Sequence, residues 1–360
     1  MDILFINSEH FWLNGWLNTP TGIKYAMDTL KGFGINVNCE EIRSSEALES
    51  LLGRLPYQTL LWPNAYYTRN ALGEVVWLQE YIEERGLPYV GTPVQGLKNM
   101  LHKNLTHQLL QAADIPVPAH LTISRHRLTQ IDRLIEKSAL QWPIVIKPSS
   151  ESCSMGILKA ENLDEAKEHI TQLFHDFPNS DALLETFLPS EDVTCGYLAM
   201  GDQQLLLPTY YQSLEVSGNT HVVERDIGTG PWGGSSIIMP PVKDTLVLEQ
   251  LQDQMPKLAA AVGITGVTRV DARMDEDGTL KFFDVNGMPA LSYPRSVLVR
   301  QVRECFPELP DHSAYEYLLR TIVIIAADRF ELSIPNSVCD QNLFSLESPL
   351  MTTLNVSHSI

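Results

Sequence analysis

Cysteine is scarce in this sequence, and the cysteines that are present form no recognisable framework. Five occur among 360 residues, at positions 39, 153, 195, 305 and 339. No two of them stand in a CxxC spacing, so the sequence indicates neither a zinc site nor a set of paired disulfides. We expect free thiols, as in a reducing compartment.

Positive charge is also in short supply. Lysine and arginine number 26 against 44 aspartates and glutamates, which gives a formal net charge of −18 and an isoelectric point near 4.9. An acidic surface repels phosphate backbones and anionic lipids, so we expect neither a nucleic-acid nor a membrane partner. A small anionic substrate stays compatible with this charge, because a single pocket can be basic within an acidic whole.

Long apolar runs are missing as well. No stretch approaches the roughly 20 consecutive apolar residues that a membrane-spanning helix needs. Residues 1–16 lack the basic leader of a secretory signal peptide, so we expect a cytoplasmic protein. A length of 360 residues suits two or three domains with substantial cores.

The first hundred residues alternate short apolar runs with helical patterns. Runs 2–6 and 60–62 predict buried strands, and segments 21–33 and 74–85 predict helices, an order typical of a parallel α/β layer. Farther along, helical patterns cover 93–113, 162–175, 246–262 and 311–330, and strands are predicted at 142–148 and 182–185. The segment 333–360 has weak periodicity, and we expect it to be peripheral or partly disordered.

Residues 266–292 read as a hairpin that carries an unusual set of polar side chains. Strands at 267–274 and 280–285 flank a turn with aspartate and glycine. If the hairpin closes around this turn, Asp271 lies opposite Asp284, and Asn286 follows just beyond. Two carboxylates at this distance repel each other unless a positive charge lies between them. Because oxygen ligands of this kind suit hard cations, the hairpin predicts a Mg²⁺ site.

Two glycine-containing segments are candidates for phosphate binding. Residues 228–233 have the GxGxxG spacing, but a proline lies inside the motif and no helix follows, so a mobile lid or a plain surface loop is favoured over a dinucleotide site. Lys147 ends a predicted strand and precedes a serine-rich loop that reaches Gly156. Backbone N–H groups of such a loop can form an anion-binding nest, although serine-rich turns are common on surfaces.

Taken together, these elements resemble the ATP-grasp ligases, and within them the D-alanine–D-alanine ligase family. The resemblance covers roughly residues 60–300 and is strongest in 86–103, 142–157, 183–198 and 266–292. It implies a fold of mixed α/β and α+β class in the three-domain ATP-grasp architecture. The expected domains are an N-terminal α/β domain (1–102), a central ATP-binding subdomain (103–184), a C-terminal catalytic subdomain (185–332) and a tail (333–360).

The resemblance also implies roles for individual residues, with ATP and two Mg²⁺ ions (or Mn²⁺) as cofactors. In the nucleotide site, Lys103 and Lys147 contact the phosphates, Glu185, Thr186, Phe187 and Leu188 line the adenine, and Asp192, or Glu191 if the register slips by one, binds the ribose. Cys153 belongs to the serine-rich lid, and Ser154 of the same loop is a catalytic candidate. Asp271, Asp284 and Asn286 hold the metal ions, and Arg269 stabilises charge that develops in the transition state.

The departures from the family pattern concern the substrate. Arg69 stands where the family has histidine, Ala290 replaces a glycine, and Arg295 replaces a serine that binds the second substrate. The usual lysine–tyrosine pair of the lid is missing, although Arg225 can supply charge there. Because arginine binds carboxylates in a bidentate manner, these substitutions favour a larger, acidic acceptor.

The main hypothesis is therefore an ATP-dependent ligase that forms a C–N bond between an amino acid and a carboxylate-bearing acceptor, with ADP and phosphate released from a phosphorylated intermediate. Among relatives it looks most similar to the ligases that act on mycosporine-glycine. A D-alanine–D-alanine dipeptide ligase is the alternative, and a non-catalytic ATP-binding regulatory protein is an alternative of another class. The resemblance also implies a homodimer.

Overall fold

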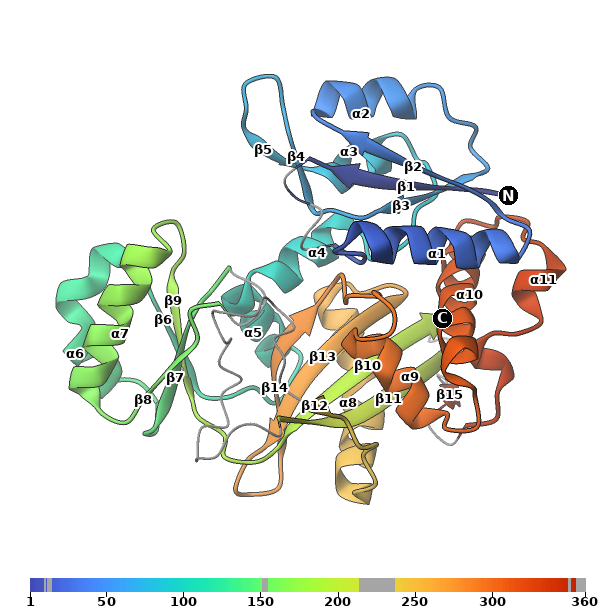
Figure 1. Cartoon of the computed structure of the whole chain (residues 1–360). Coiled ribbons are helices and arrows are strands. Elements are labelled where there is room, and N and C mark those ends of the chain that lie inside the picture. Colours follow the sequence, from blue (N-terminus) through green and yellow to red (C-terminus); the bar gives the residue numbers. More distant parts are fainter. Residues whose placement is uncertain (10, 12–14, 151–154, 214–236, 349–350, 354–360) are drawn as a thin grey trace, which may run out of the picture.

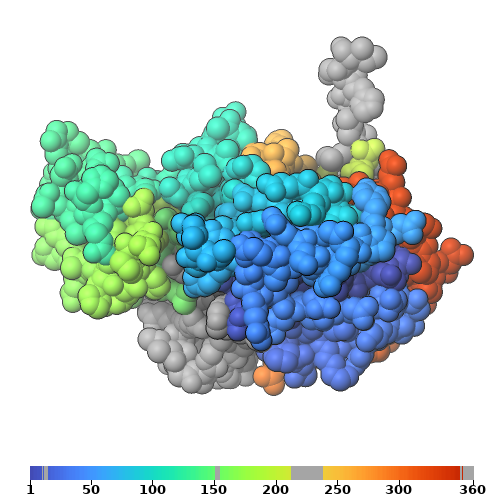
Figure 2. Space-filling model, turned by 90° about the horizontal axis from the view of Figure 1, so that it is seen from above, coloured from blue at the N-terminus to red at the C-terminus, as the bar shows by residue number. Residues whose placement is uncertain are grey.

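The structure is a computed structural model, and it describes the chain except for residues 10, 12–14, 151–154, 214–236, 349–350 and 354–360. Within the described residues, the strands form a parallel sheet near the N-terminus, a small hairpin and two antiparallel sheets (Figure 1). Seen from above, the lobe built on the central sheet projects from the rest of the molecule (Figure 2). The predicted combination of a parallel α/β layer with α+β layers is confirmed.

The N-terminal layer is a three-stranded parallel sheet in the order β2-β1-β3. Alternate residues of β1 enter different cores: Phe5 packs on the side of α1, and Ile6 packs on the side of α2 and α3. Burial on both faces explains why this strand reads as one continuous apolar run. The bounds are β1 Asp2–Ser8, α1 Pro20–Gly32, β2 Asn36–Ile42, α2 Ser45–Leu52, β3 Thr59–Pro63 and α3 Leu78–Glu84.

Two predicted helices have different limits in the structure. The helix predicted over 74–85 begins only at Leu78, because Val75–Trp77 is a strand, β5, that pairs with β4 (Tyr67–Arg69). The helical segment 93–113 is two helices, α4 (Val94–Leu101) and α5 (Lys103–Ala112). His102 separates them with extended backbone angles.

The central sheet is antiparallel, with the order β6-β9-β7-β8. One face is apolar: Ile144, Ile146 and Leu184 share a core with α6 and α7. The opposite face is turned toward the rest of the molecule (Figure 1). The bounds are β6 His120–Ile123, a 3-10 helix Arg125–Gln130, α6 Ile131–Glu136, β7 Ile144–Pro148, β8 Leu158–Ala160, α7 Leu163–Asp176 and β9 Ala182–Thr186. The boundary expected at residue 184 thus falls inside β9.

The C-terminal sheet has the order β12-β11-β10-β13-β14, and β15 pairs with the first residues of β11, at the opposite end of that strand from β12. The tail is therefore less peripheral than expected, since it supplies β15 and the fully buried Val338 and Leu343. The strand bounds are β10 Asp192–Met200, β11 Gln203–Ser213, β12 Ile237–Ile238, β13 Val267–Met274, β14 Leu280–Asn286 and β15 Met351–Thr353.

Helices complete the C-terminal part around one large core that also includes α1. The helix bounds are α8 Thr245–Val262, α9 Val297–Cys305, α10 Asp311–Arg329, α11 Asn336–Cys339 and a 3-10 helix Leu343–Ser345. No helix in the part of the chain that the structure describes is both long and apolar enough to cross a membrane.

Candidate active site

The hairpin of β13 and β14 brings the predicted metal-binding carboxylates together. Asp271 lies directly opposite Asp284, and Arg269 lies opposite Asn286, as the alternation of polar residues predicts. Immediately after this pair the register shifts: Ala272 faces Phe282, so that Phe283 is an extra residue in β14. Such a bulge turns a strand and frees backbone groups from the ladder.

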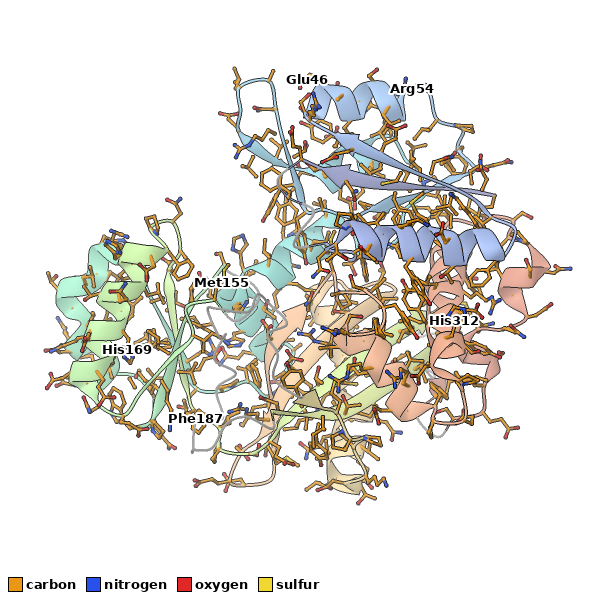
Figure 3. All side chains as sticks on the ribbon, viewed as in Figure 1. Glu46, Arg54, Met155, His169, Phe187 and His312 are labelled. Atoms are coloured by element: carbon orange, nitrogen blue, oxygen red, sulfur yellow. The ribbon has the colours of Figure 1, made fainter. Side chains whose placement is uncertain are left out.

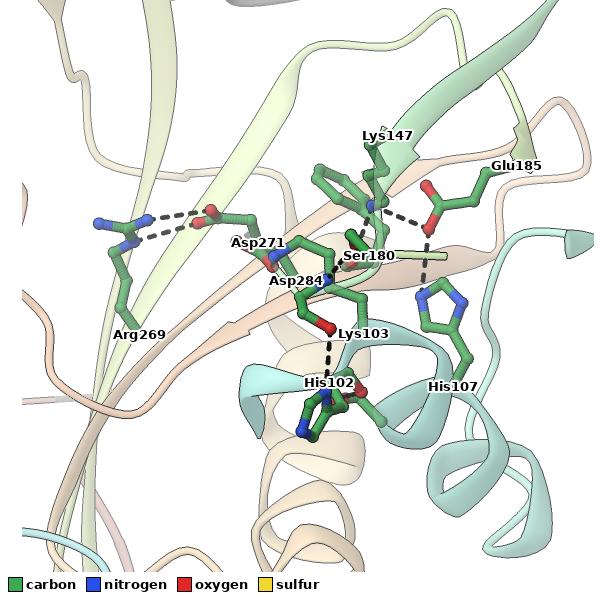
Figure 4. A network of polar contacts seen from close by, with 12 residues as sticks. His102, Lys103, His107, Lys147, Ser180, Glu185, Arg269, Asp271 and Asp284 are labelled. Atoms are coloured by element: carbon green, nitrogen blue, oxygen red, sulfur yellow. Dashed lines mark hydrogen bonds and ion pairs between the residues drawn. The ribbon is translucent and has the colours of Figure 1, made fainter. Parts of the chain in front are cut away.

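Two cations neutralise the carboxylate pair (Figure 4). Lys103 Nζ, at the start of α5, lies 3.2 Å from Asp284 Oδ1. The Arg269 guanidinium donates to both oxygens of Asp271, through Nε at 3.3 Å and Nη2 at 3.2 Å. Burial opposes the ionisation of Asp284, but Lys103, Lys147 and Arg269 outweigh it and lower its pKa. Asp284 is thus held as an anion, directly across the strands from Asp271.

The donor set fits a divalent cation. Asp271 and Asp284 supply carboxylate oxygens, and Asn286 supplies an amide oxygen that already accepts one bond from the Met288 N–H at 3.1 Å. Hard cations such as Mg²⁺ take oxygen ligands of this kind. No group of three or more His, Cys, Asp or Glu side chains that could hold a metal occurs among the described residues. A cation here would therefore need further oxygens from a bound ligand such as a polyphosphate.

A second polar cluster joins the central sheet to the same hairpin. Lys147 Nζ lies 2.8 Å from Glu185 Oε1 and donates to the Phe283 carbonyl at 3.2 Å. That carbonyl belongs to the bulge residue, whose ring also lies beneath the ammonium group, 5.4 Å from ring centroid to Nζ. The bulge therefore positions Lys147 beside the carboxylate pair. Burial raises the pKa of Glu185, although Lys147 opposes the shift.

His107 is a member of this cluster that the sequence reasoning missed. Its Nε2 lies 3.3 Å from Glu185 Oε1, without the alignment of a hydrogen bond, and its ring lies 4.6 Å from that of His120. Burial, reinforced by the charge of Lys147, lowers the pKa of His107 well below its usual range, so the imidazole is neutral. A signal was available, because His107 follows Lys103 by four residues and therefore shares its face of α5.

The predicted adenine-lining segment, 185–188, leaves the central sheet and crosses toward the C-terminal sheet. Thr186 Oγ1 accepts a bond from the Gln141 N–H at 3.0 Å. The Phe187 ring lies between two cations, with Lys159 Nζ 4.5 Å and the Arg273 guanidinium carbon 5.4 Å from its centroid. Asp192, predicted to bind ribose, forms an ion pair with Arg273. Arg273 is a second residue that the sequence reasoning did not single out.

The residues predicted to bind substrate are less closely grouped. Arg69 is exposed on the β4–β5 hairpin, where it donates to the Gly73 carbonyl at 2.8 Å and lies over the Phe11 ring. Ala290 and Arg295 lie on the loop after β14. Two contacts anchor this loop to the N-terminal layer: the Leu291 N–H donates to the Trp16 carbonyl at 2.6 Å, and Ser292 Oγ donates to Asn18 Oδ1 at 2.9 Å. Cys153, Ser154 and Arg225 lie outside the described residues.

A hollow of about 460 Å³ lies elsewhere, beside α1, and its wall contains none of the predicted site residues. Its lining includes Asn7, Ile23, Met27 and Glu41. The chemistry-bearing side chains gather instead between the central sheet and the β13–β14 hairpin (Figure 4), so we locate the functional site there.

Comparisons with known proteins identify the family of the chain. The family model described as "D-ala D-ala ligase C-terminus" matches residues 109–303, more than half of the chain. A D-alanine–D-alanine ligase of Gluconobacter oxydans is 29% identical over 252 residues, 69% of this chain and 78% of the relative. One from Streptococcus equi subsp. zooepidemicus is 25% identical over 299 residues, 81% of this chain and 77% of the relative.

Solved structures show the same fold. The D-alanine–D-alanine ligase of Bacillus anthracis superposes with a TM-score of 0.66 at 16% identity, covering 92% of this chain and 99% of the other. The VanG D-Ala:D-Ser ligase of Enterococcus faecalis superposes with a TM-score of 0.67 at 18% identity, covering 90% and 99%. The chain belongs to the D-alanine–D-alanine ligase family and is an ATP-dependent, ADP-forming ligase with the ATP-grasp fold.

Proposed function

We propose that this ligase joins the carboxylate of one amino acid to the amine of a second, with D-alanine or a similar small D-amino acid as the activated substrate. The relatives, which are D-alanine–D-alanine ligases and a D-Ala:D-Ser ligase, support this dipeptide reaction over the mycosporine-glycine reaction that the sequence first favoured. ATP supplies the phosphoryl group, and the divalent cation neutralises charge on its phosphates. We place the reaction in the cytoplasm.

The observation that carries the proposal is the carboxylate pair of the hairpin with its two cations. Asp271 and Asp284 are aligned across the strands, Lys103 holds one of them, and Arg269 holds the other. In the ligase, we expect Lys103 and Lys147 to bind phosphate oxygens and the carboxylates and Asn286 to hold Mg²⁺ or Mn²⁺. Arg269 can then turn toward the carboxylate that is activated, where its charge stabilises the developing oxyanion.

Asp271→Asn tests this assignment. The amide keeps the size of the side chain but removes the anion, so ligation is expected to fall by at least about a hundredfold while the fold is retained. The assay measures ADP release with D-alanine, ATP and Mg²⁺, together with the dipeptide by mass spectrometry. Asp253→Asn is the matched control, because Asp253 pairs with Lys257 on the exposed face of α8. Full activity in Asp271→Asn would refute the metal assignment.

The same assay separates the remaining candidates. The exposed Arg69 and Arg295 still favour an acidic acceptor such as mycosporine-glycine as a candidate substrate, because arginine binds carboxylates. Product formation with mycosporine-glycine and an amino acid, and none with D-alanine, would reverse the ranking. If the protein binds ATP but releases no phosphate with any of the acceptors, a regulatory protein would be favoured. The homodimer stays a prediction, which sedimentation of the purified protein measures.

A further inference from the structure

Arg273 is a nearly buried arginine of β13 that bonds to Leu188, in the segment between β9 and β10, and to Asp192, the first residue of β10. Its side chain is 9% exposed, and it lies two residues beyond Asp271 on the same strand. The register places Ala272 opposite Val193 in β10, so Arg273 and Asp192 are neighbours across the strands. Such pairs of opposite charge stabilise a sheet. Arg273, however, makes more contacts than one ion pair requires.

The guanidinium group donates from each of its three nitrogens. Nε and Nη2 donate to the two oxygens of Asp192, at 2.5 and 2.9 Å, in a bidentate pair. Nη1 donates to the Leu188 carbonyl at 2.9 Å, and the guanidinium plane lies near the Phe187 ring. Figure 3 shows Phe187 on the side of the central sheet that faces the C-terminal sheet. One side chain thus fixes three parts of this segment at once.

The Asp192 side chain is not fully enclosed by the pair, since 16% of it is exposed. A carboxylate oxygen can accept more than one hydrogen bond. An aspartate reaches less far than a glutamate, and the planar guanidinium compensates by setting the orientation of the carboxylate.

We propose that Arg273 is a positioning residue for the nucleotide: it holds the Asp192 carboxylate toward the ribose hydroxyls and fixes the adenine-lining segment relative to the metal-binding strand. This inference rests on the proposed nucleotide role of residues 185–192. Because Arg273 and Asp271 belong to one strand, the ribose end and the phosphate end of the site are held at a constant separation. Arg273 itself need not touch the reacting atoms.

The test compares ATP with 2′-deoxy-ATP and 3′-deoxy-ATP in Arg273→Met and Arg273→Lys. The wild-type enzyme is expected to favour ATP over the deoxy analogues by about tenfold or more, the usual worth of a hydroxyl bonded to a charged group. In Arg273→Met the KM for ATP rises by a similar factor, kcat changes little, and the preference over the analogues disappears. Arg273→Lys keeps the positive charge but cannot form the bidentate pair, and it is expected to lose part of the preference for ATP over the deoxy analogues.

Two comparisons make the role specific. Arg303→Met removes an arginine that pairs with Asp311 on α10, away from the nucleotide segment, and should leave the preference for ATP unchanged. In the double variant Asp192→Asn/Arg273→Met, the two losses should not multiply, because both remove the same ribose contact. Multiplied losses would show that Arg273 acts by another route.

The outcomes separate this inference from the function on which it rests. If the wild-type protein binds ATP by calorimetry and both Arg273 variants keep its preference over the deoxy analogues, the positioning role is wrong while the ligase assignment stands. If the wild-type protein binds no ATP, the proposed function fails and the role of Arg273 fails with it. Melting temperatures of the variants identify any that do not fold, and Arg273→Lys then decides the question.

Discussion

Glu185 shows how a single residue of this site depends on its neighbours. It is buried between Lys147 and His107, and burial alone would favour its neutral form. A buried carboxylate is tolerated when a cation compensates for the lost hydration, which Lys147 does at 2.8 Å. The neutral imidazole of His107 adds a polar partner without adding charge. The geometry therefore keeps Glu185 available as an acceptor at the predicted adenine edge.

His107→Gln should change how stability depends on pH. Because the folded-state pKa of His107 is lowered, the unfolded chain binds a proton that the folded chain refuses once the pH falls below about 6.5. Stability is therefore lost as the pH falls, by at most about 1.4 kcal/mol per pH unit from this group. Glutamine does not titrate, so this part of the loss disappears between pH 7 and pH 5.

Urea unfolding at the two pH values measures the effect. His175→Gln is the control, since the His175 side chain is 83% exposed and pairs with its neighbour Asp176. An unchanged slope of stability with pH in His107→Gln would show that this imidazole does not stay neutral in the folded protein.

At the scale of elements, the β13–β14 hairpin was the most predictable part of the site. Its alternating residues and its Asp-Gly turn are local signals, and they place Asp271 opposite Asp284 correctly. The bulge at Phe283 leaves no such signal, because its carbonyl is satisfied by Lys147, 136 residues away. Without the bulge, the Phe283 carbonyl would accept a hydrogen bond from the neighbouring strand, and Lys147 would lose this acceptor.

The break between α4 and α5 could not be predicted for a similar reason. No glycine or proline stands between residues 94 and 112 except Gly96. The break depends on a distant partner, because the Lys103 N–H donates to the Ser149 carbonyl at 2.8 Å. Thr106 Oγ1 donates to the Asn99 carbonyl of α4 at 2.7 Å and joins the two helices. Tertiary contacts thus override helix propensity and start α5 at the lysine that meets Asp284.

Gln250 of α8 stabilises the hairpin turn as a unit. Its Nε2 donates to the Gly278 carbonyl at 2.9 Å, and its Oε1 accepts from the Leu280 N–H at 2.7 Å. Gln250→Ala removes both bonds, so the free energy of unfolding is expected to fall by about 1–3 kcal/mol. Urea unfolding measures this, and hydrogen exchange should be faster at the Leu280 amide.

Two variants sharpen the test of Gln250. Gln250→Glu keeps the acceptor for Leu280 but loses the donor to Gly278, and should be intermediate. Gln172→Ala is the control, because Gln172 is on the surface of α7 and bonds to Asp176 of the same helix. If Gln250→Ala were as stable as that control, the turn would be held by its own residues.

At the scale of the whole molecule, the site exists only where three remote parts of the chain meet. Lys103 comes from α5, Lys147 and Glu185 from the central sheet, and the remaining groups from the hairpin (Figure 4). Composition and periodicity do not show which residues far apart in the sequence lie close together in the fold. The grouping was predicted only through the resemblance to a known family, and two side chains to which the resemblance gave no role, His107 and Arg273, were missed.

The N-terminal layer is attached to the rest of the molecule by Arg329, at the end of α10. Its guanidinium donates to the carbonyls of Gly91 (2.6 Å) and Tyr89 (2.8 Å) and to Thr265 Oγ1 (2.7 Å). The rings of Tyr89 and Phe330 lie 4.4 Å from the guanidinium carbon. Because none of these acceptors is a carboxylate, the arginine serves to satisfy backbone carbonyls where the N-terminal layer meets the C-terminal sheet.

Arg329→Met should therefore loosen this attachment. Methionine fills a similar space between the rings but leaves two carbonyls without a donor, so unfolding should become easier by about 2–4 kcal/mol. Arg329→Lys can satisfy part of the set and should lie between Arg329→Met and the wild type, whereas Arg127→Met, in the 3-10 helix near the surface, should be neutral. Calorimetry of the variants measures this order of stability. Tyr89 pairs with Leu61 of β3, so the carbonyls that Arg329 binds belong to the N-terminal layer. A separate low-temperature transition in Arg329→Met would show that this one side chain makes the N-terminal layer unfold together with the C-terminal sheet. An unchanged single transition would mean that the apolar contact of α1 is sufficient.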